Sequence, residues 1–515
     1  MTRWLYLIII VGILLRVSVF LVSPPSNSYD DHLEAVSKTI NSLEINRRVD
    51  PWECWECYQP PLYYLAGSIV AGVSTLFFDD IFVWKLVQSL SVLASILTLV
   101  LTSVAIKIAI PRRESLPVVY ACVAVIAVLP RALYSSAMPT NDAFLEASVA
   151  TALVGYLFVA RSNEQVRLGI ILISAGTIAA CWTKQSGLVL LVPLLGMMCF
   201  TWSGLWTPPR GLTKNIVLST AIVTLFVSGI DELWRFNKSG IFLVSNQQYF
   251  SYAVNQLPGA IANVSFFDFR FREVYESVFM SSTTLDSFWT EVFSRFWFDY
   301  ERRFFPVNDY SIWMGRISYI VGAAVTFFIL YFSLVELASK PFDLTKLVLV
   351  CFALAFLTVP ILQTIRYPYF SSMKSAFILP GLPAILCLTA IGLAGLQTVR
   401  AIRVMAWIVV GFLLTFGVLH ASSLALLSSE AWSQGLSGPL WPLPKLRSFA
   451  VLLTAILSKF QPLFWHLPTL SIAQACDAMS RQRFCTVVRL YCSRFLEKHN
   501  RPWSKSKPID LPRPH

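Results

Sequence analysis

Charged side chains are scarce in this sequence: Asp, Glu, Lys and Arg together make up 14% of its 515 residues. Soluble globular domains carry about 25% charged residues, so this composition excludes an ordinary soluble protein. Acidic residues are fewer than basic ones, 29 against 41, which gives a formal net charge of +12. The basic residues lie mostly between apolar segments and in the C-terminal tail, where they orient a membrane protein and contact anionic headgroups. We therefore expect the positive charge to contact membrane lipids and not nucleic acid.

Apolar residues are abundant, at 56% of the chain with a mean hydropathy of +0.63. They come in blocks of about 20 residues, the helix length that crosses a hydrocarbon core about 30 Å thick. The sequence thus predicts an all-α, polytopic integral membrane protein with about twelve spans. The first span, at 4–22, is followed by no signal-peptide cleavage site. The others are expected at 83–110, 115–135, 143–160, 168–183, 187–206, 215–230, 317–338, 346–365, 376–398, 404–427 and 448–466.

The segment 60–78 is apolar too, but we expect it not to cross the membrane. It begins with two prolines followed by Leu62 and a pair of tyrosines, which suits an interfacial or re-entrant element. If it did cross, the basic loops that follow would lie outside, against the positive-inside rule. The sequence therefore predicts both termini in the cytoplasm, and the plasma (inner) membrane as the location in a bacterial host.

These expectations divide the chain into a transmembrane domain, residues 1–469, and a basic cytoplasmic tail, residues 470–515. Within the first, residues 23–80 form an exterior juxtamembrane subdomain with two helices. Residues 231–316 form a long exterior loop that is rich in aromatic side chains. A polar linker has no need of them, so we expect this loop to pack on the membrane domain as a lid or substrate wall.

Ten cysteines are scattered through the chain, and most lie in apolar spans, where they act as small hydrophobic residues. Cys54 and Cys57 stand close together in an exterior loop. Such a pair forms a disulfide or half of a metal site. Because no second pair of ligands lies nearby, the sequence favours a local structural role.

A short amphipathic stretch follows the first span. Leu33, Val36, Ile40 and Leu43 recur at helical spacing, and the stretch is too short and too polar to cross, so we expect it to lie in the interface. Its first turn carries four titratable residues, Asp30, Asp31, His32 and Glu34. Acids at this position also cap a helix and complement its dipole, for about 0.3–1 kcal/mol. The stretch alone does not decide between capping and chemistry.

A further acid, Asp142, falls on the same exterior face, where Asn141 and Asp142 head a span. Charges at the mouth of a span are costly unless they are solvated, paired or used. The cations expected on this face are Arg131, Lys184, Arg366 and Lys374. Each alone suits a residue that snorkels at a helix end, but together they form what a site for an anionic lipid phosphate requires. Arg16, within the first span, either snorkels or is directed into this site.

Five short segments, taken in order, give the sequence a resemblance to a known group of proteins. They are Tyr29-Asp-Asp-His32, Tyr58-Gln-Pro-Pro-Leu-Tyr-Tyr64, Asn141-Asp142, Thr183-Lys184-Gln-Ser-Gly187 and Lys374-Ser-Ala-Phe-Ile-Leu-Pro-Gly-Leu-Pro383. Over most of residues 1–400 the sequence resembles GT-C glycosyltransferases, in the branch of protein O-mannosyltransferases and lipid A aminoarabinose transferases. It departs from them in the Asp-Asp-His order, where members often show Asp-Glu, and in lacking the long soluble C-terminal domain of some members.

The resemblance implies transfer of a hexose or pentose from an undecaprenyl- or dolichyl-phosphate carrier to an acceptor glycan, lipid or protein, with inversion. One carboxylate must accept the acceptor proton, and the leaving phosphate needs charge stabilisation. We expect Asp30 to be the base, with Asp31 beside it as the alternative, and Asp142 to orient the acceptor or a metal. A divalent ion, Mg or Mn, held by Asp31 and Asp142 is a possible cofactor. The substrate-binding candidates are His32, Glu34, Tyr58, Tyr63, Arg131, Asn141, Lys184, Arg366 and Lys374.

A multi-pass transporter of a lipid-linked or small solute is the main alternative. Transporters concentrate ionisable groups and broken helices near the bilayer midplane, often in repeated halves. Here the spans are nearly free of charge, the acids lie at one surface, and no internal repeat is found, which favours an interfacial enzyme. A non-catalytic membrane scaffold is the third interpretation, and a lipid-linked oligosaccharide polymerase or ligase is a variant of the enzyme interpretation.

Overall fold

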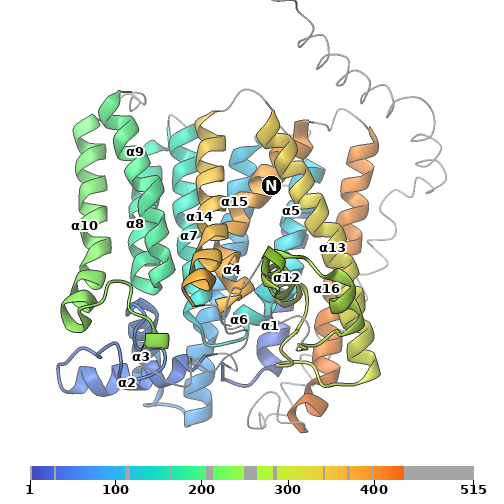
Figure 1. Cartoon of the computed structure of the whole chain (residues 1–515), viewed down its shortest axis with the longest axis horizontal. Coiled ribbons are helices and arrows are strands. Elements are labelled where there is room, and N and C mark those ends of the chain that lie inside the picture. The colour runs from blue at the N-terminus through green and yellow to red at the C-terminus, as the bar shows by residue number, and fades with distance from the viewer. Residues whose placement is uncertain are drawn as a thin grey trace, which may run out of the picture.

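The computed structural model describes residues 3–27, 30–110, 116–161, 164–204, 213–248, 264–281, 287–339, 343–367, 372–395 and 400–433. Within these ranges the chain is helical and has no strand, and ten helical segments are long and apolar enough to cross a membrane. They stand side by side in Figure 1. They are α1 (Arg3–Val22), α4 (Asp80–Ala109), α7 (Asn141–Arg161), α8 (Val166–Thr183), η2 with α9 (Gln185–Leu190, Leu191–Ser203), α10 (Lys214–Ser239), α13 (Asp309–Ala338), α14 (Leu344–Arg366), η7, η8 and α15 (Ser375–Phe377, Leu379–Gly381, Leu382–Gly395), and Val404–Leu427 within α16 (Arg400–Ser433).

A bent pair, α5 (Leu116–Val128) and α6 (Pro130–Ser136), passes the same test when taken together, with an angle of 51° between its halves. The described residues therefore hold up to eleven spans, which correspond to eleven of the twelve expected. The twelfth, at 448–466, and the tail 470–515 lie outside the described residues. The predicted all-α, polytopic fold is confirmed.

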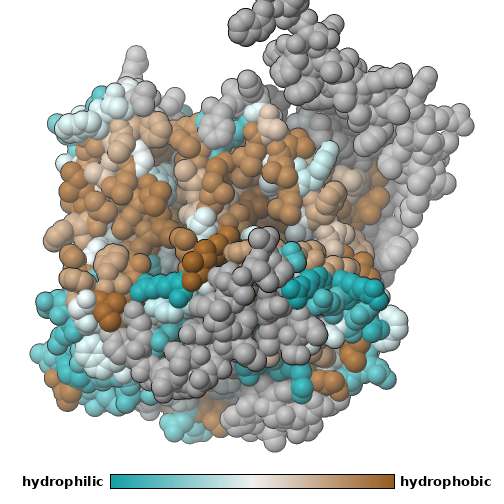
Figure 2. Space-filling model, viewed as in Figure 1, coloured by the Kyte–Doolittle hydropathy of each residue, from teal (hydrophilic) through white to brown (hydrophobic). Residues whose placement is uncertain are grey.

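The apolar segment at 60–78 forms α3 (Leu62–Ser74), a helix of 13 residues. At 1.5 Å per residue it is about 20 Å long, shorter than a hydrocarbon core of about 30 Å, and it is not among the helices long enough to cross. Figure 1 shows α3 and α2 (His32–Glu44) together at one end of the bundle, which we call the α2 end. Figure 2 shows a hydrophobic belt over the spans and a hydrophilic band over the α2 end.

The break between α5 and α6 explains Arg16. Pro130 cannot donate a backbone hydrogen bond, and at the break the carbonyls of Ile126 and Ala127 accept from the Arg16 guanidinium at 2.9 and 3.0 Å. Arg16 also donates to Ser95 Oγ at 2.9 Å and is 1% exposed. Arg16 therefore neither snorkels nor reaches the expected phosphate site. It donates hydrogen bonds to the backbone carbonyls at the break between α5 and α6.

Close packing of α7 on α8 brings the start of one beside the end of the other. A Cβ at Gly176 of α8 would lie 2.5 Å from the backbone nitrogen of Ala152 in α7, so only glycine permits this approach. After α8 the chain turns sharply back, and a Cβ at Gly187 would lie 2.2 Å from the carbonyl oxygen of Ala180. These two glycines fix Asp142, at the start of α7, against Lys184, at the end of α8.

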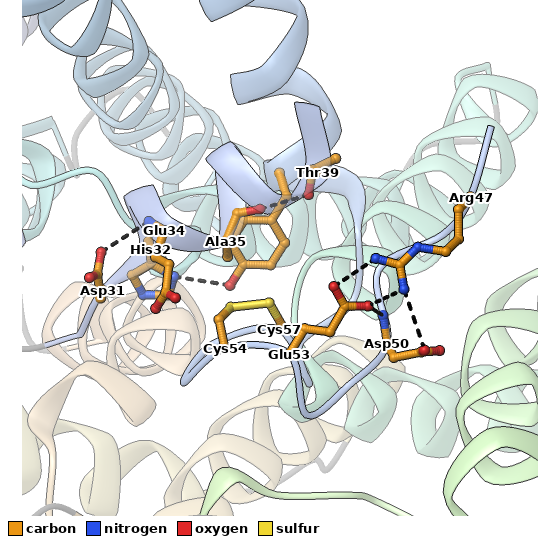
Figure 3. Close-up of a disulfide and its surroundings, with 11 residues drawn as sticks. Asp31, His32, Glu34, Ala35, Thr39, Arg47, Asp50, Glu53, Cys54 and Cys57 are labelled. Atoms are coloured by element: carbon orange, nitrogen blue, oxygen red, sulfur yellow. Dashed lines mark hydrogen bonds and ion pairs between the residues drawn. A yellow bond between two sulfur atoms is a disulfide. The ribbon is translucent and has the colours of Figure 1, made fainter. Parts of the chain in front are cut away.

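The loop that connects α2 to α3 contains a disulfide between Cys54 and Cys57, drawn in Figure 3. The buried face of α2 consists of His32, Ala35, Val36, Thr39 and Ser42. Of the predicted stripe, Val36 is fully buried and Leu33 and Ile40 pack against the same cluster, whereas Leu43 is 52% exposed. Several side chains of this face are small because α3 packs closely against it. Ser68 Oγ of α3 donates to the carbonyl oxygen of Val36.

The segment predicted as an exterior loop over 231–316 begins inside α10 and ends inside α13. Its described parts include η3 (Asn246–Gln248), η5 (Val264–Phe267), α11 (Phe271–Glu276) and α12 (Phe288–Trp297). Phe288 and Trp297 of α12 are at most 1% exposed, and Trp297 Nε1 donates to Thr326 Oγ1 of α13 at 3.0 Å. The described part of the loop thus packs on the spans, as its aromatic content predicts.

Candidate active site

Two aspartate–lysine pairs meet at the α2 end. The ammonium of Lys374 contacts both carboxylate oxygens of Asp30, at 2.9 and 2.7 Å. The ammonium of Lys184 donates to a carboxylate oxygen of Asp142. Lys184 also acts electrostatically on Asp30, so the two pairs share one site.

Asn27 connects the chain segments that carry the two acids. Its side-chain oxygen accepts the backbone N–H of Asp30 at 3.3 Å, and its side-chain nitrogen donates to the carbonyl of Pro139 at 3.1 Å. Three residues after Pro139, Asp142 begins α7, where Thr140 Oγ1 accepts its backbone N–H at 3.2 Å. The linker after α1 is thereby tied to the first turn of α7.

Lys184 is held from two sides. Asn141, at the start of α7, donates to the carbonyl of Thr183 at 3.4 Å, which fixes the end of α8. The ammonium of Lys184 lies 5.1 Å from the centre of the Phe377 ring in η7, a favourable cation–π distance. Asn141, predicted to bind substrate, thus has a positioning contact in this structure.

The Asp30–Lys374 pair is ionised. Burial disfavours the carboxylate of Asp30, but the Lys374 ammonium outweighs it and holds the pKa of Asp30 below its usual range. Burial likewise opposes the charge of Lys374, yet Asp30 raises the pKa of this lysine above its usual value. Each side chain is still 17% exposed, so a ligand can reach the pair.

Glu56 belongs to the same cluster and was not predicted. It lies between the two bridged cysteines and is 3% exposed. Burial first, and then the charge of Asp30, raise the pKa of Glu56 well above its usual value. Its carboxyl is therefore a third acid beside the two pairs, and it holds its proton more readily than a free glutamate does. Its place in a polar, exterior loop gave no sign of burial.

His32 contacts Tyr64 of α3. Its Nδ1 lies 3.0 Å from the hydroxyl of Tyr64, and the two rings stack at 6.0 Å. Burial lowers the pKa of His32 to about 4, despite the opposing charge of Asp30, so the ring is neutral at pH 7. Tyr63 packs edge-on against Phe144 of α7 at 5.3 Å.

Tyr58 and Arg131 also lie near the cluster. The Tyr58 hydroxyl accepts from Gln59 at 2.6 Å, and its backbone carbonyl accepts from Arg235 of α10 at 2.9 Å. Arg131, in α6, is 4% exposed and acts electrostatically on Asp142. Glu146, one turn beyond Asp142 on α7, is 3% exposed, so the spans hold more buried charge than the sequence indicated.

Asp31 and Glu34 do not join the site. Asp31 caps α2 by accepting the backbone N–H of Glu34 at 3.0 Å, as Figure 3 shows, and both residues are exposed. Arg366 is exposed as well, at the end of α14, with its guanidinium 5.1 Å from the Tyr367 ring.

The residues expected to hold a metal do not fit one. Asp31 is used as a helix cap and Asp142 is paired with an ammonium. Among the described residues, no group of three or more His, Cys, Asp and Glu side chains is arranged to hold a metal ion. The cations in direct contact with Asp30 and Asp142 are Lys374 and Lys184.

The fold and the site define a polytopic membrane protein with a paired, ionised cluster at one mouth of its helical bundle. No protein-family model and no curated protein matches the sequence. Solved structures do match. ArnT from Cupriavidus metallidurans bound to undecaprenyl phosphate is 14% identical, with 89% of this chain and 78% of that chain covered and a TM-score of 0.46.

The apo state of the same ArnT is 12% identical, over 89% of this chain and 77% of that one, with a TM-score of 0.45. An oligosaccharyltransferase from Archaeoglobus fulgidus, tethered with an acceptor peptide that contains the NVT sequon, is 14% identical, with a TM-score of 0.40. This chain is covered over 85% and that one over 56%. Because a fold hosts many functions, the function of this chain rests on its own residues.

Proposed function

We propose that this chain is a membrane glycosyltransferase that moves a hexosyl or pentosyl group from a polyprenyl-phosphate carrier to an acceptor glycan, lipid or protein. The observation that carries the proposal is the meeting of Asp30, Asp142, Lys184 and Lys374 at the mouth of the bundle. At this position a carrier in the membrane and an acceptor in water both reach the same side chains.

Charge changes in the reaction suit these residues. A sugar phosphodiester carries about one negative charge, and the polyprenyl phosphate monoester that leaves carries about −1.5 to −2 at pH 7. Two lysines beside the phosphate stabilise the charge that develops as its bond to the anomeric carbon breaks. They therefore bind the transition state more strongly than the donor, which is what accelerates a reaction.

Asp30 acts as the general base. An acceptor hydroxyl or amine attacks the anomeric carbon from the face opposite the phosphate, the carbon–phosphate oxygen bond breaks, and the acceptor proton passes to Asp30. One displacement of this kind inverts the anomeric centre. As Asp30 becomes neutral and the phosphate gains charge, Lys374 exchanges one anion for the other.

Asp142, Lys184 and Arg131 form the second half of the site. Asp142 orients the acceptor while Lys184 and Arg131, whose charges both act on Asp142, face the phosphate. No metal takes part in this scheme. The side chains of Glu56 and His32 border the sugar and the acceptor.

The α2 end faces the exterior, either the periplasm or a lumen. Basic residues mark the opposite ends of several spans, including Lys107 and Arg161 in the last turns of α4 and α7. The positive-inside rule places such residues in the cytoplasm, and it supports cytoplasmic termini in a plasma (inner) membrane for a bacterial host.

The test is to incubate the purified protein with radiolabelled undecaprenyl- and dolichyl-phosphate sugars and candidate acceptors, with and without a chelator. We expect turnover of at least one carrier, an inverted product by NMR, and no effect of the chelator. No turnover of any carrier would contradict the proposal. Movement of an unchanged labelled carrier across vesicle membranes would favour a transporter instead.

A further inference from the structure

A buried charged triad lies behind Lys374. It is formed by Arg295 in α12 with Glu291 in the same helix and Glu301 just beyond it. Arg295 Nη2 lies 2.9 Å from Glu291 Oε2, and Arg295 Nε lies 2.9 Å from Glu301 Oε1. The three side chains are 3%, 0% and 6% exposed. Burying charges costs free energy, and a buried ion pair is weak evidence for stability. Stabilising α12 therefore does not by itself explain this triad.

Arg295 is bonded to the chain segment that carries Lys374. Its Nη1 donates to the carbonyl oxygen of Met373 at 3.1 Å. Met373 is fully buried and packs with Phe288 and Val292 of α12. The peptide bond between Met373 and Lys374 is therefore fixed on α12 by a charge-assisted hydrogen bond and by apolar contact.

The same segment touches the second pair of the site. Lys374 reaches Asp30, and three residues later the Phe377 ring lies 5.1 Å from the Lys184 ammonium. A shift of residues 373–377 would consequently move the partners of both lysines.

The triad also carries an excess of negative charge, two carboxylates against one guanidinium. Arg303, which is 41% exposed, lies 3.9 Å from Glu301 and offsets part of it. Burial opposes the charge of Lys374, and Asp30, Glu56 and Glu301 raise its pKa. In the proposed reaction Asp30 becomes neutral, so Glu301 remains as a fixed anion near Lys374.

We propose that Arg295, together with Glu291 and Glu301, positions Lys374 and, through Phe377, Lys184 for the transfer reaction. The segment from α12 to Glu301 then positions side chains of the site, in addition to forming the wall or lid that its aromatic content predicts. The catalytic consequence rests on the proposed function, whereas the contact with the Lys374 segment does not.

The first experiment measures the reactivity of the Lys374 amine and needs no substrate. The protein is treated with an acetylating reagent at pH 8, and the acetylation of Lys374 is followed by mass spectrometry against Lys238, which is 48% exposed. The variants are Arg295→Lys, which keeps the charge but loses the fork of donors, and Glu301→Gln. The matched control is Arg272→Gln in α11, whose side chain is 88% exposed.

We expect Lys374 to react at least ten times faster in Arg295→Lys and several times faster in Glu301→Gln, with no change in Arg272→Gln. Unchanged reactivity of Lys374 in both test variants would overturn the proposal. If Arg295→Lys fails to fold, Glu301→Gln decides alone, because it removes a charge and keeps the shape.

The second experiment is a double-mutant cycle on kcat/KM for sugar transfer, with Arg295→Lys and Lys374→Gln alone and together. If Arg295 acts through Lys374, the loss of kcat/KM caused by Arg295→Lys largely disappears when Lys374 is already replaced by Gln. Additive losses would assign Arg295 a merely structural role and overturn the proposal. Absence of transfer by the wild-type protein would overturn the proposed function, and the lysine reactivity would still test the positioning.

Discussion

Asp30 and Lys374 are joined by two hydrogen bonds although 344 residues separate them in the sequence. The neighbouring acid, Asp31, is exposed and caps α2. Two identical side chains in succession therefore have different surroundings, one ionised in a pocket of charges and the other on the surface. This difference provides a matched pair of variants.

Asp30→Asn and Asp31→Asn are expected to separate catalysis from capping. A positioned general base contributes about 10²–10⁴-fold, so Asp30→Asn should lower kcat by about that factor. Asp31→Asn retains a good capping side chain and should keep transfer close to wild type. Initial rates of sugar transfer, with thermal unfolding as the folding control, measure both. Equal losses in the two variants would contradict the assignment of the base.

Lys374→Gln is expected to destabilise the protein, because it leaves the Asp30 carboxylate without its ammonium. Removal of one partner of a fully buried pair costs about 3–5 kcal/mol, and partial exposure reduces the cost here to about 1–3 kcal/mol. The double variant Asp30→Asn/Lys374→Gln should recover much of this loss. Unfolding in detergent, followed by tryptophan fluorescence, gives the three free energies. A double variant as unstable as the sum of the single ones would refute the pairing.

His32 predicts an acid-dependent loss of stability. Its pKa falls from 6.5 to about 4 on folding, first because of burial, so the unfolded chain binds the proton more readily. Stability from this group is present above pH 6.5 and is lost as the pH falls towards 4, by about 3 kcal/mol in total. His32→Gln keeps a polar partner for Tyr64 and lacks the titration.

The measurement for His32 is the difference in unfolding free energy between wild type and His32→Gln from pH 7 to pH 4. Titrating groups that do not interact with His32 are present in both proteins and cancel. We expect the difference to move in favour of the variant as the pH falls. A difference that is independent of pH would show that His32 is not buried as a neutral ring.

Loss of the Cys54–Cys57 disulfide is expected to cost about 2 kcal/mol, the entropy of closing a loop of four residues. A reducing agent and the Cys57→Ser variant should lower the thermal midpoint equally. Because Glu56 lies inside this loop, transfer activity should fall as well. Cys199→Ser, at an exposed free cysteine of α9, is the control. No response to a reducing agent in the wild type would contradict the structural role of the bridge.

Much of the membrane architecture could be predicted from the sequence. Runs of about 20 apolar residues predict the spans, because every helix that crosses the bilayer must span the same hydrocarbon thickness. The charge of the loops after 60–78, together with Pro60 and Pro61, indicated that α3 does not cross. Aspartates and lysines at span ends were correctly expected to gather at one face, because isolated charges there are costly.

The pairing within the site could not be predicted in the same way. Which lysine meets which aspartate depends on helix packing, and Gly176 and Gly187 gave no sign of their close contacts. Glu56 and Arg295 were missed because a charged residue in an exterior segment usually faces water. On α2 the predicted stripe is confirmed at Val36, Leu33 and Ile40, which pack in or against one apolar cluster, whereas Leu43 is exposed.

The long separation of Asp30 from Lys374 has a consequence for biosynthesis. At about 5–20 residues per second, a ribosome needs roughly 20–70 s to make the 344 residues between them. During that time Asp30 is present in the nascent chain without its lysine. A nascent chain that stalls before α14 is inserted therefore ends as a bundle of spans that lacks half of its charged mouth.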